Sequence, residues 1–291
     1  MGFKGIYQHK SSRFKFLILL SLIFISVIAH MLLAIGFVFL FFDNGMMLIQ
    51  NQDLSNQASV NYLKLMQLFS GIGLFITPLL LYSYLTNFNF SLIKSSAKGI
   101  MLVGIIIVLI TPFIALLLEW NRMIPLPDWL LKFDVNSEAF LIAFLKMDSV
   151  LELLYTLLVI AVVPAIGEEL LFRGYLQKKI GQRLGNMHIS ILITGFLFSA
   201  IHFHFEGIIP RFVLGVLLGY IFYWGKNLWL PIFAHFVNNA QAVILYYPLF
   251  EVENSLYSIS SEEKVMPMLA VLSLISAVGV LYIFYCSTKK D

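Results

Sequence analysis

The sequence predicts an all-α polytopic membrane protein with about eight transmembrane helices. Of the 291 residues, 60% are hydrophobic and only 12% are charged, and the mean hydropathy is +0.89. Soluble domains are typically about 45–50% apolar and about 25% charged. Long apolar runs recur along the whole chain, and most Lys and Arg residues fall on one predicted side of the membrane. The composition therefore excludes a soluble globular domain, and we find no signature of nucleic-acid binding.

The predicted spans follow from the length of each apolar run, because a helix needs roughly 20 apolar residues to cross a bilayer. They are residues 16–42, 65–85, 100–118, 151–164 with its apolar continuation, 188–203, 212–224, 228–247 and 268–285. The first run is too long for the core of a signal peptide, and no clear cleavage site of small residues follows it. We therefore expect it to be a helix of the mature protein.

The distribution of charge predicts the orientation. With the N-terminus in the cytoplasm, 13 of the 19 Lys and Arg residues lie inside, and Lys64 is among the six outside. Cytoplasmic connections of membrane proteins are enriched in Lys and Arg. An even number of spans with both termini in the cytoplasm fits this asymmetry.

Three regions differ in character. Residues 1–150 combine apolar spans with two polar external loops, and the second loop, 119–148, carries prolines and a tryptophan that suggest an ordered interfacial segment. Residues 151–250 hold nearly all the intramembrane Glu, His and Asn, whereas 251–291 form an external loop and the last span. Gly215 and Gly219 have the spacing that lets helices pack closely. Cys286, the single cysteine, is interpreted as a small apolar residue at a helix end.

The first polar cluster is Glu168-Glu169-Leu-Leu-Phe-Arg173, inside an apolar run. An ionised carboxylate at bilayer depth is costly unless it has a partner, so this pair predicts a functional site. Glu169 and Arg173 are four residues apart and share a helix face, which predicts an ion pair that braces the helix. Glu168 points about 100° away from Glu169 and is free for chemistry.

Two further clusters lie on the following apolar segments. His202 ends the run Phe198-Ser-Ala-Ile-His202, and His204 lies on another face, nearer the external water. His235 and Asn239 are four residues apart and share a face, while Asn238 lies off it. Because unpaired polar groups are costly in a membrane, we expect His235 and Asn239 to meet Glu168 and His202.

Such a cluster supports two routes to an activated water. Glu168, His202 and His235 could bind Zn²⁺ or another divalent metal and leave one position open for water. Alternatively, Glu168 assisted by His202 could act as general base without a metal, while His235 and Asn239 donate hydrogen bonds to the oxyanion. The residues alone leave both routes open.

The three clusters, Glu-Glu-x-x-x-Arg, Phe-x-x-x-His and His-x-x-x-Asn in that order, resemble the motifs of the CAAX protease and bacteriocin-processing (CPBP, or Abi) family. The resemblance covers about residues 150–250. It implies an eight-helix intramembrane metalloprotease with a cavity open to the cytoplasm. Glu168, Glu169, Arg173, His202, His235 and Asn239 occupy the matching positions, with Glu169 and Arg173 in supporting roles.

The predicted function is therefore an intramembrane endopeptidase of a prokaryotic plasma membrane that cleaves a peptide bond near the cytoplasmic face. Its expected partners are membrane lipid and a peptide or protein substrate, such as a lipidated or membrane-anchored tail. Two alternatives are a non-catalytic scaffold or bacteriocin-immunity factor and a transporter. The absence of polar clusters before residue 150 argues against the inverted halves of many transporters. Signature motifs of other proteases, such as His-Glu-x-x-His and Gly-x-Ser-x-Gly, are missing from the sequence.

Overall fold

The computed structural model describes residues 3–42, 45–50, 53–93, 95–247 and 266–289, with the side chains of 132–138 also excluded. These residues form helices and connecting turns, without any strand among them. The all-α prediction is thereby confirmed. The external loop predicted after residue 250 lies outside the described residues.

The helices follow one another along the chain with short connections. Their bounds are α1 Ser12–Phe41, α2 Gly45–Gln50, α3 Gln57–Gly71, α4 Thr77–Thr86, α5 Ala97–Arg122, α6 Asp128–Leu145, α7 Val150–Thr156, α8 Val163–Glu169, α9 Lys178–Leu184, α10 Met187–Ala200, α11 Ile208–Gly225, α12 Trp229–Leu245 and α13 Pro267–Thr288. Three π-helical segments, η1 Ile72–Ile76, η2 Leu157–Val162 and η3 Leu170–Gln177, join α3 to α4, α7 to α8 and α8 to α9. A short 3-10 segment, η4 Phe205–Gly207, precedes α11.

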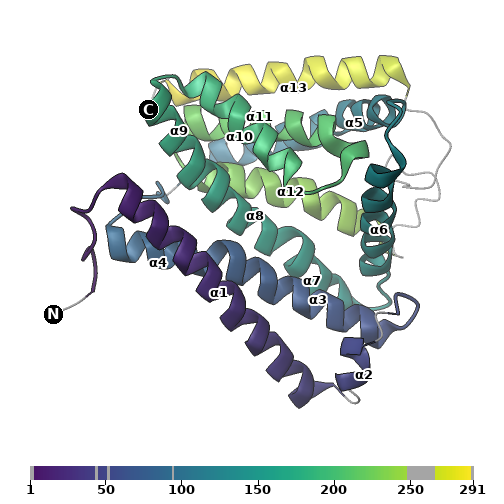
Figure 1. Cartoon of the computed structure of the whole chain (residues 1–291). Coiled ribbons are helices and arrows are strands. Elements are labelled where there is room, and N and C mark those ends of the chain that lie inside the picture. The colour runs from purple at the N-terminus through teal and green to yellow at the C-terminus, as the bar shows by residue number, and fades with distance from the viewer. Residues whose placement is uncertain (1–2, 43–44, 51–52, 94, 248–265, 290–291) are drawn as a thin grey trace.

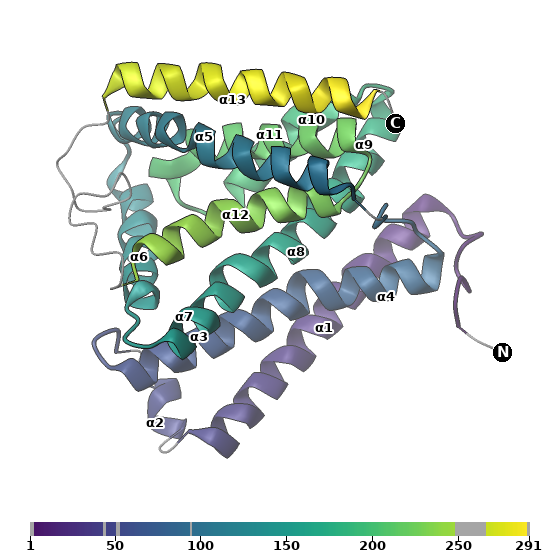
Figure 2. The ribbon, with the colours of Figure 1, turned by 180° about the vertical axis from the view of Figure 1, so that it is seen from behind.

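The bundle places the long helix 150–184 between two groups of helices (Figures 1 and 2). On one side α1 packs against α3, η1 and α4, and on the other α5 packs along α13, α12 and α11. The two termini lie at the same end of the bundle in both views, and α6 crosses the opposite end. The segment 119–148 thus contains an ordered helix at the edge of the bundle.

Six helical stretches in the described residues are long and apolar enough to cross a membrane, so the predicted count of eight is not confirmed. They are Ser12–Phe41, Gln57–Thr86, Ala97–Arg122, Val150–Leu184, Phe205–Gly225 and Pro267–Thr288. The predicted spans 188–203 and 228–247 correspond to α10 and α12, which have only 14 and 17 residues. At 1.5 Å per residue, α10 is about 21 Å long, shorter than the roughly 30 Å hydrocarbon layer.

Lys64 does not lie in an external loop, as its charge suggested, but inside α3. Its side chain is fully buried, and Nζ donates a hydrogen bond of 2.8 Å to Oγ1 of Thr156 in α7. The same interface holds Glu152, which accepts from the backbone N–H of Asp148 at 2.8 Å. A cation is therefore buried where the first helices meet the long helix.

Pro112 interrupts the backbone ladder of α5, and a side chain from α13 repairs it. In a regular α-helix the N–H of Phe113 would bond to the carbonyl of Leu109. Here the hydroxyl of Ser273 lies between them, accepting from the Phe113 N–H at 3.3 Å and donating to the Leu109 carbonyl at 2.7 Å. The pairing of α5 with α13 therefore includes a polar bridge within an apolar core.

Candidate active site

The two glutamates lie near the middle of the long helix, in α8. Glu168 is 18 residues after Val150 and 16 before Leu184, or about 27 Å and 24 Å from the two ends at 1.5 Å per residue. The π-helical segments η2 and η3 flank α8 on both sides. Such segments are frequent at functional sites because the wider turn changes which face a side chain occupies.

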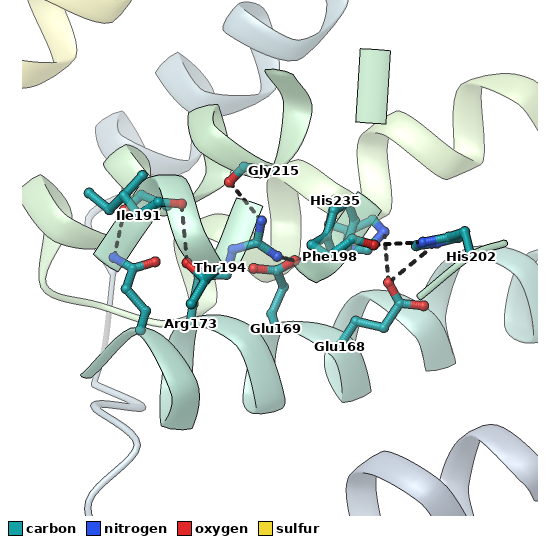
Figure 3. Close-up of polar contacts among 11 residues, drawn as sticks. Glu168, Glu169, Arg173, Ile191, Thr194, Phe198, His202, Gly215 and His235 are labelled. Atoms are coloured by element: carbon teal, nitrogen blue, oxygen red, sulfur yellow. Dashed lines mark hydrogen bonds and ion pairs between the residues drawn. The ribbon is translucent and has the colours of Figure 1, made fainter. Parts of the chain in front are cut away.

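Glu169 and Arg173 form the ion pair that their spacing predicts. The distance from Nη1 of Arg173 to Oε1 of Glu169 is 2.6 Å, and neither side chain has any exposed surface. Nη2 of Arg173 also donates to the carbonyl of Gly215 in α11 at 2.8 Å, and the guanidinium lies 4.7 Å from the ring centroid of Phe198. Figure 3 shows both side chains pointing from the long helix toward α11 and His235. The pair thus ties three helices together at the depth of the site.

His235 of α12 is held by Glu169. Its Nδ1 lies 2.9 Å from Oε1 of Glu169, which also accepts from Arg173. An ionised carboxylate can only accept, so Nδ1 carries the proton of this hydrogen bond. In the neutral ring the lone pair is then on Nε2, which lies 4.0 Å from Oε2 of Glu168.

His202 is oriented in the same way by a backbone carbonyl. Its Nδ1 donates to the Phe198 carbonyl at 2.8 Å, so the Nε2 lone pair of the neutral ring faces Oε2 of Glu168 at 3.9 Å. The ring follows the end of α10, where Phe203 has a left-handed φ of 49°. A non-glycine residue seldom adopts this conformation, and strain of this kind is concentrated at functional sites.

Glu168, His202 and His235 therefore present three hydrogen-bond acceptors to one point, as Figure 3 shows. Oε2 of Glu168 is buried and has no hydrogen-bond partner among the described residues. The Glu168 and His202 side chains retain 13% and 29% of their accessible surface, so the site is enclosed but reachable. Acceptors that face each other need a donor or a cation between them, since otherwise their lone pairs repel.

A water molecule or a metal ion would fill this requirement. Two ligands of a tetrahedral zinc ion lie about 3.4 Å apart, and two partners of one tetrahedral water lie about 4.6 Å apart. The gaps of 3.9 and 4.0 Å lie between these values. As they stand, no three His, Cys, Asp or Glu side chains among the described residues are placed to hold a metal, but the donor set suits one. Both imidazoles donate Nδ1–H to an oxygen, the usual arrangement for metal-binding histidines.

Asn239 is not brought to the same point. Its Nδ2 donates to the backbone carbonyl of Ile160 at 3.0 Å, and its Oδ1 accepts from Nδ2 of Asn238 at 3.0 Å. His204 likewise faces away from Glu168, with its Nδ1 2.9 Å from Nη1 of Arg211. The expectation that Asn239 meets Glu168 and His202 is therefore not met, although α12 does present His235 and Asn239 on one side.

Sequence reasoning missed two contributors. Gln177 is one turn after Arg173, is fully buried, and donates to the carbonyl of Gly219 at 3.0 Å, as Arg173 does to Gly215. Its i+4 spacing from Arg173 was a usable signal. Phe198 has its ring centroid within 5.2–5.5 Å of those of His202 and His235. It stood in the motif but received no role.

The glycines of α11 confirm the predicted close packing. A Cβ on Gly215 would lie 3.0 Å from both the Cα and the carbonyl oxygen of Gly195 in α10. The two backbones are thus in direct contact, which leaves the Gly215 carbonyl within reach of Arg173.

The fold and this site define a helical membrane protein with a buried Glu/His cluster facing a reachable space. Residues 150–241 match the family model of Rce1-like type II CAAX prenyl endopeptidases, which confirms the resemblance to the CPBP family over this segment. The match suggests intramembrane protease activity. A curated relative, "Uncharacterized protein YpbD" of Bacillus subtilis (strain 168), is 34% identical over 80 residues, which are 26% of this chain and 38% of that protein. No solved structure matches.

Proposed function

We propose that this protein is an intramembrane endopeptidase that hydrolyses a peptide bond with a water held by Glu168, His202 and His235. The observation that carries the proposal is the convergence of one carboxylate oxygen and two Nε2 lone pairs on a single point, at 3.9 and 4.0 Å. Each imidazole is oriented by its own acceptor, so the set is organised before a substrate binds. A purely structural cluster would instead be expected to satisfy its buried polar atoms internally.

The proposed step is direct attack of this water on the peptide carbonyl. Glu168 accepts a proton from the water as its oxygen bonds to the carbonyl carbon, and passes that proton to the leaving nitrogen as the C–N bond breaks. His202 and His235 orient the water through Nε2. Glu169 is not free for this step, because it is bonded to Arg173 and His235.

A divalent metal such as Zn²⁺ fits the same three side chains by donor chemistry. Glu168, His202 and His235 would hold it, and the ion would supply a bound water acidic enough to form hydroxide near neutral pH. Metal content of the purified protein tests this directly. We expect about one zinc per chain in the unaltered protein and none in the His202→Ala variant.

We also propose that both termini face the cytoplasm of a prokaryotic cell, supported by the excess of Lys and Arg on that side. The substrate is a lipidated or membrane-anchored peptide tail, and cleavage near the cytoplasmic face remains our prediction. The printed family name, a CAAX prenyl endopeptidase, motivates the choice of a prenylated probe.

The test is Glu168→Gln, assayed with a fluorescence-quenched farnesylated CAAX peptide and its unprenylated counterpart. The amide cannot take a proton from water, so we expect kcat to fall by roughly 10²–10⁴-fold. Glu152→Gln, 16 residues earlier on the same long helix, is the matched control and should retain full activity. Unchanged turnover in Glu168→Gln would exclude this residue as the base. No cleavage of either peptide by the unaltered protein would favour the scaffold alternative.

A further inference from the structure

Pro164 interrupts the long helix one turn before Glu168. In a regular α-helix the N–H of residue 164 would bond to the carbonyl of Ile160. Proline has no N–H, and its ring crowds that carbonyl. The preceding turn is π-helical, with the Val163 N–H bonded to the Leu158 carbonyl five residues earlier. The carbonyl of Ile160 therefore lacks the α-helical donor of residue 164 at a depth where unpaired backbone groups are costly.

Asn239 supplies a donor to that carbonyl from another helix. Its Nδ2 lies 3.0 Å from the Ile160 oxygen, and the side-chain amide is oriented by Asn238, whose Nδ2 donates to Oδ1 at 3.0 Å. α12 packs against both η2 and α8, so this hydrogen bond spans the interface on which the site is built. The amide thus stands in for the backbone N–H that Pro164 lacks.

The same device occurs at Pro112, the other proline bridged in this way among the described residues. There Ser273 of α13 bonds to the carbonyl of Leu109 and to the N–H of Phe113. That bridge lies in the α5–α13 interface, on elements that carry none of the proposed site residues. It shows that polar side chains of neighbouring helices repair interrupted backbone ladders in this fold, and it provides an internal comparison.

We propose that Asn239 is a positioning residue that acts through Pro164 rather than on the reacting atoms. α12 holds the long helix at two points: Asn239 at the Ile160 carbonyl, before the proline, and His235 at Glu169, after it. Together these contacts fix the bend at Pro164 and with it the distance from Glu168 to His202 and His235. The effect on Glu168 rests on the proposed function, whereas the coupling between Asn239 and Pro164 does not.

A double-mutant cycle tests the coupling, because alanine at position 164 restores the missing N–H. The variants are Asn239→Leu, Pro164→Ala and the two combined, each compared by Tm in detergent micelles and by kcat and KM with the farnesylated CAAX peptide. We expect Asn239→Leu to lower Tm by roughly 2–10 °C, since it leaves a buried carbonyl unpaired. In the Pro164→Ala background the same change should lower Tm by less than about a third as much.

Activity should follow the same pattern. Asn239→Leu alone should reduce kcat by at least about tenfold with KM nearly unchanged, because Glu168 is displaced while substrate binding is kept. In the Pro164→Ala background it should reduce kcat less than about twofold. Asn238→Leu is the matched control and should have smaller effects on both quantities. Ser273→Ala should lower Tm and leave kcat unchanged.

Two results would overturn the proposal. One is an Asn239→Leu defect in kcat of equal size in both backgrounds, which would place the amide on the reacting atoms as an oxyanion donor. The other is a Tm that Asn239→Leu lowers equally, or not at all, with and without Pro164. Failure of the proposed function would look different. Full activity in Glu168→Gln, or no cleavage by any variant, would leave the Tm cycle intact.

Discussion

Replacing Arg173 by methionine tests the buried ion pair at the centre of the site. The change removes the 2.6 Å contact to Glu169, the 2.8 Å hydrogen bond to the Gly215 carbonyl and the stacking over Phe198 at 4.7 Å. Neither charged side chain has exposed surface, so Glu169 would remain as a buried carboxylate with only His235 beside it. Breaking one side of such a pair costs about 3–5 kcal/mol.

That loss is large against the total free energy of unfolding, which is typically about 5–15 kcal/mol. For a chain of this size each kcal/mol shifts Tm by about 2–4 °C, so we expect Arg173→Met to lower Tm by roughly 6–20 °C. Thermal unfolding in detergent micelles, followed by circular dichroism, measures the shift. Arg122→Met is the matched control, because the Arg122–Glu206 contact is 3.9 Å long and both side chains are about a third exposed. Exposed pairs contribute about 0–1 kcal/mol.

The double variant Glu169→Gln, Arg173→Met removes both charges but keeps an acceptor for His235. We expect it to recover most of the lost Tm, because the isolated buried charge is gone. If Arg173→Met shifts Tm no more than Arg122→Met, or if the double variant is no more stable than the single one, the ion pair does not have the energetic role argued here.

Two further predictions concern packing away from the proposed chemistry. Lys64→Met should raise Tm by roughly 2–6 °C, because Lys64 is fully buried and no described carboxylate lies within 4.0 Å of it, so an apolar side chain of similar length avoids the cost of burying the charge. An equal or lower Tm in thermal unfolding would show that the cation stabilises the α3–α7 interface. Gly215→Ala should lower Tm by roughly 2–10 °C, because the added Cβ would lie 3.0 Å from backbone atoms of Gly195. Gly279→Ala, whose Cβ would meet nothing within 4 Å, should leave Tm unchanged or slightly higher; a similar loss in both variants would refute the packing argument.

The contacts that the sequence predicted correctly are the local ones. The spacing of Glu169 and Arg173 was sufficient to predict their ion pair, because residues four apart on a helix are neighbours whatever surrounds them. The all-α class followed from composition for a similar reason, since a membrane admits few backbone structures. The motif order also placed His202 and His235 near Glu168.

The tertiary partners and the number of spans were not predictable in this way. The hydrogen bond of Asn239 depends on which carbonyl Pro164 leaves without a donor, and this follows from a π-helical register that no residue pattern reveals. The span count failed because apolar runs do not mark where a helix ends. α10 stops at Ala200, although apolar residues continue to Phe203. His235 bonds to Glu169 rather than Glu168, which depends on how α12 crosses the long helix.

The early end of α10 has a consequence for how a hydrolase can work below the headgroups. Beyond Ala200 the chain leaves the helix, and Ile201, Phe203 and part of His202 are exposed. Backbone outside a helix cannot face acyl chains, because its N–H and C=O groups would go unbonded. Lipids must therefore thin around this point, or solvent must reach it. In either case α10 opens a hydration path that ends beside His202, and the supply of the second reactant is built into the length of one helix.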